Sequence, residues 1–442
     1  MTGRLGAGGD DRSASAIPGV RIILDVRPLQ DPDGAPTTAV YLAELLAAFA
    51  ADPLPGESFA FLLQAGLEDP TATTELAALN VVGRRLLPPT RLLRAGALTI
   101  DPLLLRGASL GAAWRAEAGG AAGSVYHAAG GAAPIASGVP VVVTLLDLAP
   151  WELPVAYQAT AVARFGQRLR ARILRDAAAV IVGSAAAARA ARRLLHVRRD
   201  RIRIVPLAPR SAFNPAASER AAGEVARLGL PERYLVYPGR YDARQDLGTL
   251  LRALAALADP AGNRPAAGAG PGAGGAAAWT PRPAVDAPWP PRLVLVGASP
   301  ADRAALARAA AREGVGELVS YAPYLPTDRL AAIVGGARAV VLPSLSDSAG
   351  LAAIEALACG TPVVASAVGA LPELVAGAGI LVEPRDARRL AIALATAWSD
   401  ETVHVRLVAE ARARAAQADR SWADVARETR QVYAEVARPS IG

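Results

Sequence analysis

The chain has 442 residues, 52% of them hydrophobic, which is enough to bury the cores of two domains of about 200 residues each. Its formal net charge of +7 rests on arginine alone, because the sequence contains no lysine, and such a bias of the whole composition does not point to nucleic acid as a partner. A single cysteine excludes an internal disulfide and three histidines argue against a zinc site, so we expect no metal and a reducing compartment.

The first residues, 1–18, lack the apolar core of a secretory signal and predict a disordered leader. No uninterrupted apolar run reaches the roughly 18 residues that a membrane helix needs. We therefore expect a cytoplasmic protein, either in solution or at the inner face of the membrane.

The first half of the chain alternates short β-branched runs with helical segments rich in Ala, Leu and Arg, which is the pattern of a parallel α/β sheet. Buried strands are predicted to begin at Arg21, Val139, Ala178 and Ile202. The segment 164–177 carries five arginines on an expected helix. We favour a solvated helix face for it, with peripheral contact to a membrane surface or an anionic acceptor as the alternative.

The pattern restarts in the second half, with strands predicted to begin at Tyr234, Arg292, Leu318, Ala339, Thr361 and Gly379. Two doubly wound α/β domains in series are therefore expected, an N-terminal one over 19–212 and a C-terminal one over 213–420. Residues 260–291 are rich in Pro, Gly and Ala and predict a disordered insertion. The final segment, 421–442, predicts a capped helix whose apolar face must dock elsewhere.

Three loops of the second sheet follow the carboxyl ends of strands, the edge at which open α/β sheets bind ligands. The first, PGRYDARQD, offers Arg240 and Arg244, whose guanidiniums can clamp a diphosphate in bidentate fashion. The second, VGAS, brings Gly297, and the third is SLSDSAG.

The third loop opens a helix between two acids, Asp347 and Glu355. Free N–H groups near Ala349, Gly350 and Leu351, with Ser348 beside them, would favour an anion. Glu355, one turn further on, can accept hydrogen bonds from ribose or sugar hydroxyls. Together these loops describe a receptor for a nucleotide diphosphosugar.

These loops belong to longer stretches, YLVYPGRYDARQDLGTLLRALAAL, RLVLVGAS and AVVLPSLSDSAGLAAIEALACGTPVVAS, and the chain closes on SWADVARETRQVYAEV. Together they resemble the GT-B glycosyltransferases of the large retaining mannosyl- and glucosyltransferase family (family 4, "glycosyl transferases group 1"). The first half resembles that family more loosely, through VRIILDVRPLQ, VYHAAGGAAP and VPVVVTLLDL.

The resemblance implies two Rossmann-like domains facing each other across a cleft, with the donor on the C-terminal sheet and the last helix crossing back to the first domain. It also implies transfer of a hexose from a nucleotide diphosphosugar to a hydroxyl acceptor, with retention and without a metal or cofactor. The expected acceptor is a saccharide or a lipid-linked molecule of cell-envelope synthesis.

The family's E-x7-E motif falls on Asp347 and Glu355, of which the resemblance assigns the first to the sugar near its reacting carbon and the second to the ribose. Its diphosphate-binding Arg and Lys fall on Arg240 and Gln245, so a positive charge is lost at the second position. Leu325 stands at the position beside the nucleobase.

In the first domain, the resemblance places Asp147 at the reacting sugar, with Leu146 where the family has histidine. Thr37 and Thr38 stand where the family has a glycine-rich turn, and His127 is expected to line the acceptor side. These departures leave a second hypothesis open, a catalytically impaired GT-B protein that binds a nucleotide sugar or a partner transferase.

Other classes fit less well. A nicotinamide dehydrogenase is disfavoured because no G-x-G-x-x-G turn follows an early strand, and a GT-B epimerase lacks an acid/base pair. Asp31 and Asp33 resemble a metal-binding DxD only superficially, and we interpret them as a turn.

Overall fold

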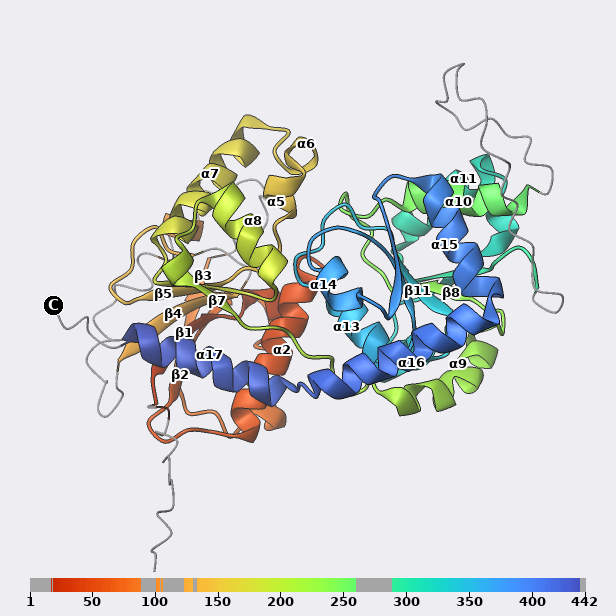
Figure 1. The fold of residues 1–442 in the computed structure, drawn as a ribbon. Helices are drawn as coiled ribbons and strands as arrows, with labels where there is room; N and C mark the ends of the chain where they lie inside the picture. Colours follow the sequence, from red (N-terminus) through yellow and green to blue (C-terminus); the bar gives the residue numbers. More distant parts are fainter. Residues whose placement is uncertain are drawn as a thin grey trace, which may run out of the picture.

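The computed structural model describes residues 17, 19–88, 101–103, 105, 123–129, 133–259 and 288–437. They form two α/β units, each built on a parallel sheet (Figure 1). Of the predicted leader, 1–18, only residue 17 is described. Residues 260–287 of the predicted insertion and residues 438–442 also lie outside the described residues.

The first sheet has seven strands, all paired in parallel. In spatial order they are β3 (Val81–Leu87), β2 (Ser58–Gln64), β1 (Arg21–Asp25), β4 (Ser124–Ala129), β5 (Val141–Thr144), β6 (Ala179–Val182) and β7 (Ile202–Ile204). The four strands predicted from apolar runs are confirmed. The other three are β2, β3 and β4.

The second sheet has six parallel strands. Their order is β10 (Val319–Ala322), β9 (Leu293–Val296), β8 (Leu235–Tyr237), β11 (Ala339–Leu342), β12 (Val363–Ser366) and β13 (Gly379–Val382). All six were predicted. The four central strands, β9, β8, β11 and β12, are buried throughout because helices cover both faces of the sheet, whereas the edge strands β10 and β13 are only partly buried.

Each sheet has one apolar core on each face. The helices of the first unit are α1 (Arg27–Gln30), α2 (Pro36–Ala51), α5 (Ala149–Glu152), α6 (Pro154–Tyr157), α7 (Ala161–Asp176) and α8 (Ala185–Leu195). Those of the second are α9 (Ala221–Leu228), α10 (Leu247–Ala258), α11 (Pro300–Arg312), α12 (Thr327–Gly335), α13 (Leu351–Ala358), α14 (Leu371–Val375), α15 (Ala387–Ser399) and α16 (Glu401–Ala418). None of the helices in the described part of the chain is long and apolar enough to span a bilayer.

The last helix, α17 (Trp422–Ala437), leaves the second unit and packs on the first (Figure 1). The chain turns at Asp419, which has a left-handed φ of 31°, and Asp424 then accepts a hydrogen bond from the Ser421 N–H at 2.9 Å. The apolar face of α17 joins the core between α2 and the first sheet. The two units are therefore tied together at a second point besides the 205–214 connection.

Candidate functional site

The candidate site lies where segments after β1 and β5 of the first sheet meet loops after β8 and β11 of the second. Leu148 donates its N–H to the Ser348 hydroxyl at 3.1 Å, and the Ser346 hydroxyl donates to the Glu152 carboxylate at 2.5 Å. Both contacts join the two units. The carboxyl edges of the two sheets, which the sequence predicted to carry the ligand, therefore face each other.

Arg240 occupies a strained turn after β8. Its φ of 68° lies in the left-handed region, which costs a non-glycine residue on the order of 1 kcal/mol, and the Tyr237 hydroxyl donates to its carbonyl. The guanidinium donates to the Thr37 hydroxyl at 2.5 Å and to Asp242 at 3.1 Å. Its Nε is buried and has no partner among the described residues. The turn thus aims a partly unsatisfied cation at the first unit.

Arg244 lies four residues further along the same loop. Its Nε pairs with Asp242 at 3.0 Å, and its Nη1 pairs with Asp147 of the first unit at 3.1 Å. The guanidinium also lies over the Tyr157 ring, 5.9 Å from its centroid. The structure therefore brings the two predicted arginines together. Asp242 holds both, a role that the sequence signals only by placing an acid between two arginines.

Asp347 caps the turn that precedes α13. Its Oδ1 accepts the N–H of Gly350 at 2.8 Å, so the prediction that this N–H is free is wrong. Burial raises the pKa of the Asp347 carboxyl, against the lowering effects of the Gly350 N–H and of Arg240 and Arg244. The carboxylate is therefore within the electrostatic reach of both arginines.

Gly350 itself requires glycine, since its φ is 64° and a Cβ there would lie 2.1 Å from Leu374. Its neighbours face the first unit: Ser348 accepts from Leu148, and Ala349 and Leu351 pack into the core of the first sheet. In this structure the start of α13 is thus an interface as well as a candidate anion site.

Glu355 is not a solvated helix residue. It is buried and paired in bidentate fashion with Arg210, at 2.6 and 3.0 Å, and Arg210 also donates to the Thr327 hydroxyl at 3.0 Å. Burial raises the pKa of Glu355, and the pairing with Arg210 acts against it. Burial likewise raises the pKa of nearby Glu44, on α2, against the lowering effect of Arg210. Arg210 lies on the connection between the units, where no sequence pattern identified it.

Two further residues predicted on the donor side, Gly297 and Leu325, follow β9 and β10. Gly297 follows β9 with a φ of 75° and open space around its Cα. The Leu325 side chain is only 3% exposed and packs into the core, and the placement of this position beside a nucleobase stays a prediction. The adjacent Tyr324 is 83% exposed and close enough to Arg210 to contribute, after Glu355 and Glu44, to the raised pKa of that arginine. It offers a free aromatic face at this site.

Gln245, which stands at the lysine position, accepts a hydrogen bond from the Ser344 hydroxyl at 3.0 Å. It therefore fixes the two loops of the second unit to each other. On the first unit, Thr37 lies in the first turn of α2 and contacts Arg240, while Thr38 is buried behind it.

His127 is a core residue. Its Nδ1 bonds the Tyr433 hydroxyl at 2.6 Å and its Nε2 the Thr144 hydroxyl at 2.8 Å, and the residue has no exposed surface. Burial lowers its pKa to about 3. The prediction that His127 lines the acceptor side is therefore wrong. A neutral imidazole at this place ties α17 to β4 and β5.

The other carboxylates near the first strand form a turn, as interpreted from the sequence: Asp31 accepts the N–H of Gly34 at 3.3 Å. Within the described ranges, no group of three or more His, Cys, Asp or Glu residues is arranged to hold a metal ion.

Comparison with known proteins adds sequence relatives of part of the chain. Residues 277–400 match the family described as "Glycosyl transferases group 1". D-inositol 3-phosphate glycosyltransferase of Frankia alni is 42% identical over 138 residues, which are 31% of this chain and 33% of that protein. The enzyme of the same name from Streptomyces bingchenggensis is 34% identical over 238 residues, 51% of this chain and 46% of that protein. The chain thus matches less than half the length of these relatives.

Solved structures share the arrangement over nearly the whole chain. Sucrose-phosphate synthase from Thermosynechococcus elongatus has a TM-score of 0.68 at 23% identity, covering 94% of this chain and 98% of that one. HepE of Anabaena, solved in complex with UDP-glucose, has a TM-score of 0.61 at 15% identity, covering 95% of this chain and 100% of that one. At these identities the likeness concerns the fold.

Proposed function

Because residues 277–400 belong to the glycosyl transferases group 1 family and the chain has the GT-B fold, as the sequence predicted, we propose that this protein is a glycosyltransferase. It moves a hexose from a nucleotide diphosphosugar to a hydroxyl acceptor. The observation that carries the proposal is the convergence of Arg240, Arg244 and Asp347 at the facing edges of the two sheets. Two guanidiniums beside one carboxylate suit a diphosphate joined to a polyol.

In this proposal the donor diphosphate binds Arg240 and Arg244, and their charge stabilises the diphosphate as it leaves. Asp347 contacts the hexose, and Glu355, positioned by Arg210, accepts hydrogen bonds from the ribose. Tyr324 supplies a face on which the base stacks. We assign Asp147 to the acceptor side of the reacting sugar, since it is the carboxylate of the first unit nearest to Arg244.

We propose retention of configuration and no metal. The two arginines offer the positive charge that a departing diphosphate needs. Transfer then depends on positioning and on charge stabilisation rather than on a covalent intermediate. Retention is tested by the stereochemistry of the product, and the lack of a covalent intermediate is tested by the failure to trap a glycosyl-enzyme.

For the acceptor we propose a saccharide or a lipid-linked molecule of the cell envelope. The relatives named above act, by their names, on an inositol phosphate. Helix α7 supports contact with the inner face of the membrane, because its arginines accompany the exposed apolar side chains of Val162 and Phe165, 48% and 60% exposed.

The test is a binding screen against UDP-, GDP- and ADP-sugars with the wild type and Glu355→Ala. One nucleotide sugar should bind, and the substitution should weaken it about tenfold or more, since it removes the hydroxyl acceptor and leaves Arg210 unpaired. Glu317→Ala, at an exposed site of the same unit, is the matched control and should bind as the wild type does. No binding of any nucleotide sugar to the wild type would overturn the proposal.

A second candidate function is binding without turnover. It is favoured by Gln245, which carries no charge and is already bonded to Ser344, and by Leu146, which is buried beside Asp147. Binding of a donor without hydrolysis or transfer over a broad acceptor panel would select this candidate over the transferase.

A further inference from the structure

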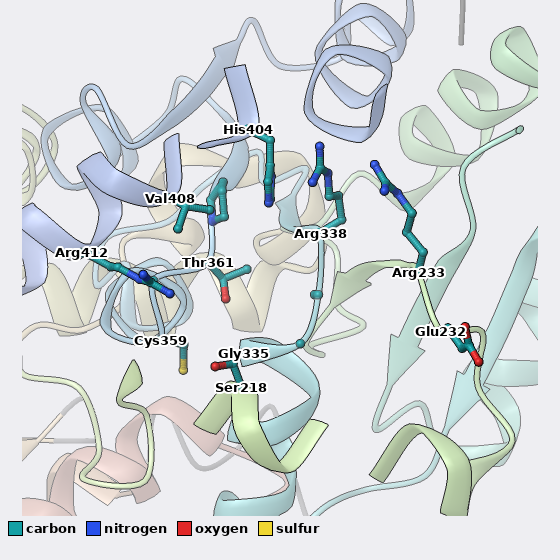
Figure 2. A pocket seen from close by; sticks show the side chains of 14 residues that line it. Ser218, Glu232, Arg233, Gly335, Arg338, Cys359, Thr361, His404, Val408 and Arg412 are labelled. Atoms are coloured by element: carbon teal, nitrogen blue, oxygen red, sulfur yellow. The ribbon is translucent and has the colours of Figure 1, made fainter. Parts of the chain in front are cut away.

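A hollow in the C-terminal unit lies at the amino ends of β8, β11 and β12 (Figure 2). The candidate site described above lies at the opposite, carboxyl edge of the same sheet. The volume of the hollow is about 340 Å³, which falls in the range of small-molecule pockets. Its walls come from the residues before these strands, from the turn after α13 and from one face of α16.

The charges of this hollow are unbalanced. Arg233 and Arg338 precede neighbouring strands, and the pKa of Arg233 is lowered by burial and then by the charge of Arg338, against the raising effect of Glu401. One carboxylate, Glu401, pairs with Arg338 at 2.8 Å, and it is 66% exposed. Glu232 lies at the rim. A ligand with negative charge would relieve the repulsion between the two guanidiniums.

Both arginines are held in place and still have N–H groups to offer. Arg233 stacks over Trp398 at 5.1 Å and donates to the Trp398 carbonyl, but its Nε is buried without a partner in the described part of the chain. Arg338 donates to the Ala397 carbonyl at 3.0 Å and to Glu401. A guanidinium has five N–H groups, so each keeps donors for a ligand.

Helix α16 completes the wall with His404, Val408 and Arg412, which share one face because they are four residues apart. Figure 2 shows the His404 ring next to Arg338, with Arg233 on the far side of Arg338. The His404 Nδ1 is buried and has no partner among the described residues. Burial and Arg338 lower the pKa of His404 to about 4, against the raising effect of Glu401. A neutral ring can still donate from one nitrogen.

Arg412 lies on the other side of the hollow, over Gly360, where a Cβ would come within 3.0 Å of its side chain. The hollow is thus bordered by three guanidiniums and an imidazole from three separate segments of the chain. We propose that it is a binding site for the phosphate group of a small phosphorylated metabolite. Its size leaves room for more than the phosphate itself, and it lies apart from the proposed donor site.

The test uses the full chain and three histidine ring signals in its NMR spectrum. Inorganic phosphate, and then a hexose monophosphate, is titrated at constant ionic strength. The His404 signal, assigned with His404→Gln, should shift to saturation, while the signal of His127 in the first core should not move. Tighter binding of the hexose monophosphate would identify the ester as the ligand, and equal binding would identify free phosphate.

Arg412→Glu should weaken phosphate binding about tenfold, since it reverses one of the three bordering charges. The residue is exposed, so the variant should fold, and Arg412→Ala provides a milder second variant. Arg406→Glu is the matched control, because it reverses an exposed charge of α16 that does not border the hollow, and it should bind as the wild type does. A His404 signal that does not respond to either phosphate, or equal weakening by the two charge reversals, would overturn the proposal.

Discussion

At the scale of single residues, two arginines at the candidate site are already paired with carboxylates of the protein, and a bound donor would compete with those carboxylates. Arg244 pairs with Asp147 across the interface, and Arg210 occupies both oxygens of Glu355. A donor diphosphate would have to share or replace the first of these pairs. The strained backbone of Arg240 is consistent with such a site, because strain of this kind persists where the surrounding contacts hold it.

This competition gives a prediction for Asp147→Asn. Without the carboxylate, Arg244 loses its partner in the first unit and is free for the diphosphate, so affinity for the nucleotide sugar should rise severalfold while the transfer rate falls. Isothermal titration and a transfer assay measure the two effects. Asp200→Asn, which breaks the exposed pair with Arg198 on the first unit, is the control and should change neither. A lower affinity in Asp147→Asn would contradict this reading.

At the scale of elements, the binding of α17 to the first unit rests on a buried ion pair. Arg430 and Glu57 are 2.6 Å apart, and both side chains are 4% exposed. Arg430 also lies over the Phe49 ring, 4.7 Å from its centroid. Tyr433 adds its bond to His127. These contacts decide where the helix docks, since its apolar face alone would allow several positions.

We predict that Arg430→Met lowers the free energy of unfolding by about 3–5 kcal/mol, because it leaves Glu57 buried and unpaired. Urea unfolding measures the change. Arg203→Ala, which breaks the exposed pair between β7 and Glu435 of α17, should cost about 1 kcal/mol or less. Equal losses of unfolding free energy in the two variants would show that the buried pair of Arg430 stabilises the fold no more than the exposed pair of Arg203 does.

The predictability of the elements follows from burial. Ten strands could be predicted because each is a short run of mostly apolar residues, and most of them are covered on both faces, although β7, β10 and β13 are only partly buried. The missed β3 is an edge strand that alternates exposed and half-buried residues and carries Arg84 and Arg85, so it lacks that signal. At the site, the loops after strands predicted Arg240, Arg244 and Glu355. Arg210 was missed because its partner lies 145 residues away.

At the scale of the whole molecule, the two units are joined by contacts on both sides of the candidate site. Glu373 of α14 accepts the N–H groups of Ala185 and Ala186, at 2.9 and 3.0 Å, and so caps α8 of the first unit. A carboxylate is favoured at such a helix start. From these contacts and those of α17 we expect the two cores to unfold together, so that a buried group in either unit would affect the stability of both.

Two such groups predict an acid-sensitive stability. Burial lowers the pKa of His127 to about 3 and, with Arg338, that of His404 to about 4, whereas an unfolded histidine titrates near 6.5. Between these values the unfolded chain binds protons that the folded chain does not. The free energy of unfolding should therefore fall as the pH falls from about 6.5 to 5, by up to about 1.4 kcal/mol per pH unit for the fully buried His127 and by less for His404, which is half-buried and screened by solvent.

Urea unfolding at several pH values in that window measures the slope. His404→Gln should reduce it, because the substitution removes one of the two groups that titrate there and leaves the His127 network intact. Asp347 and Glu355, whose pKa values are raised by burial, act in the opposite direction, since a raised carboxyl pKa favours the folded state as the pH falls. Their effect extends from the raised pKa values down to the ordinary ones, and it is the same in the wild type and in His404→Gln. The difference in slope between the two proteins therefore reports on His404 alone, and equal slopes would contradict its neutral state in the folded protein.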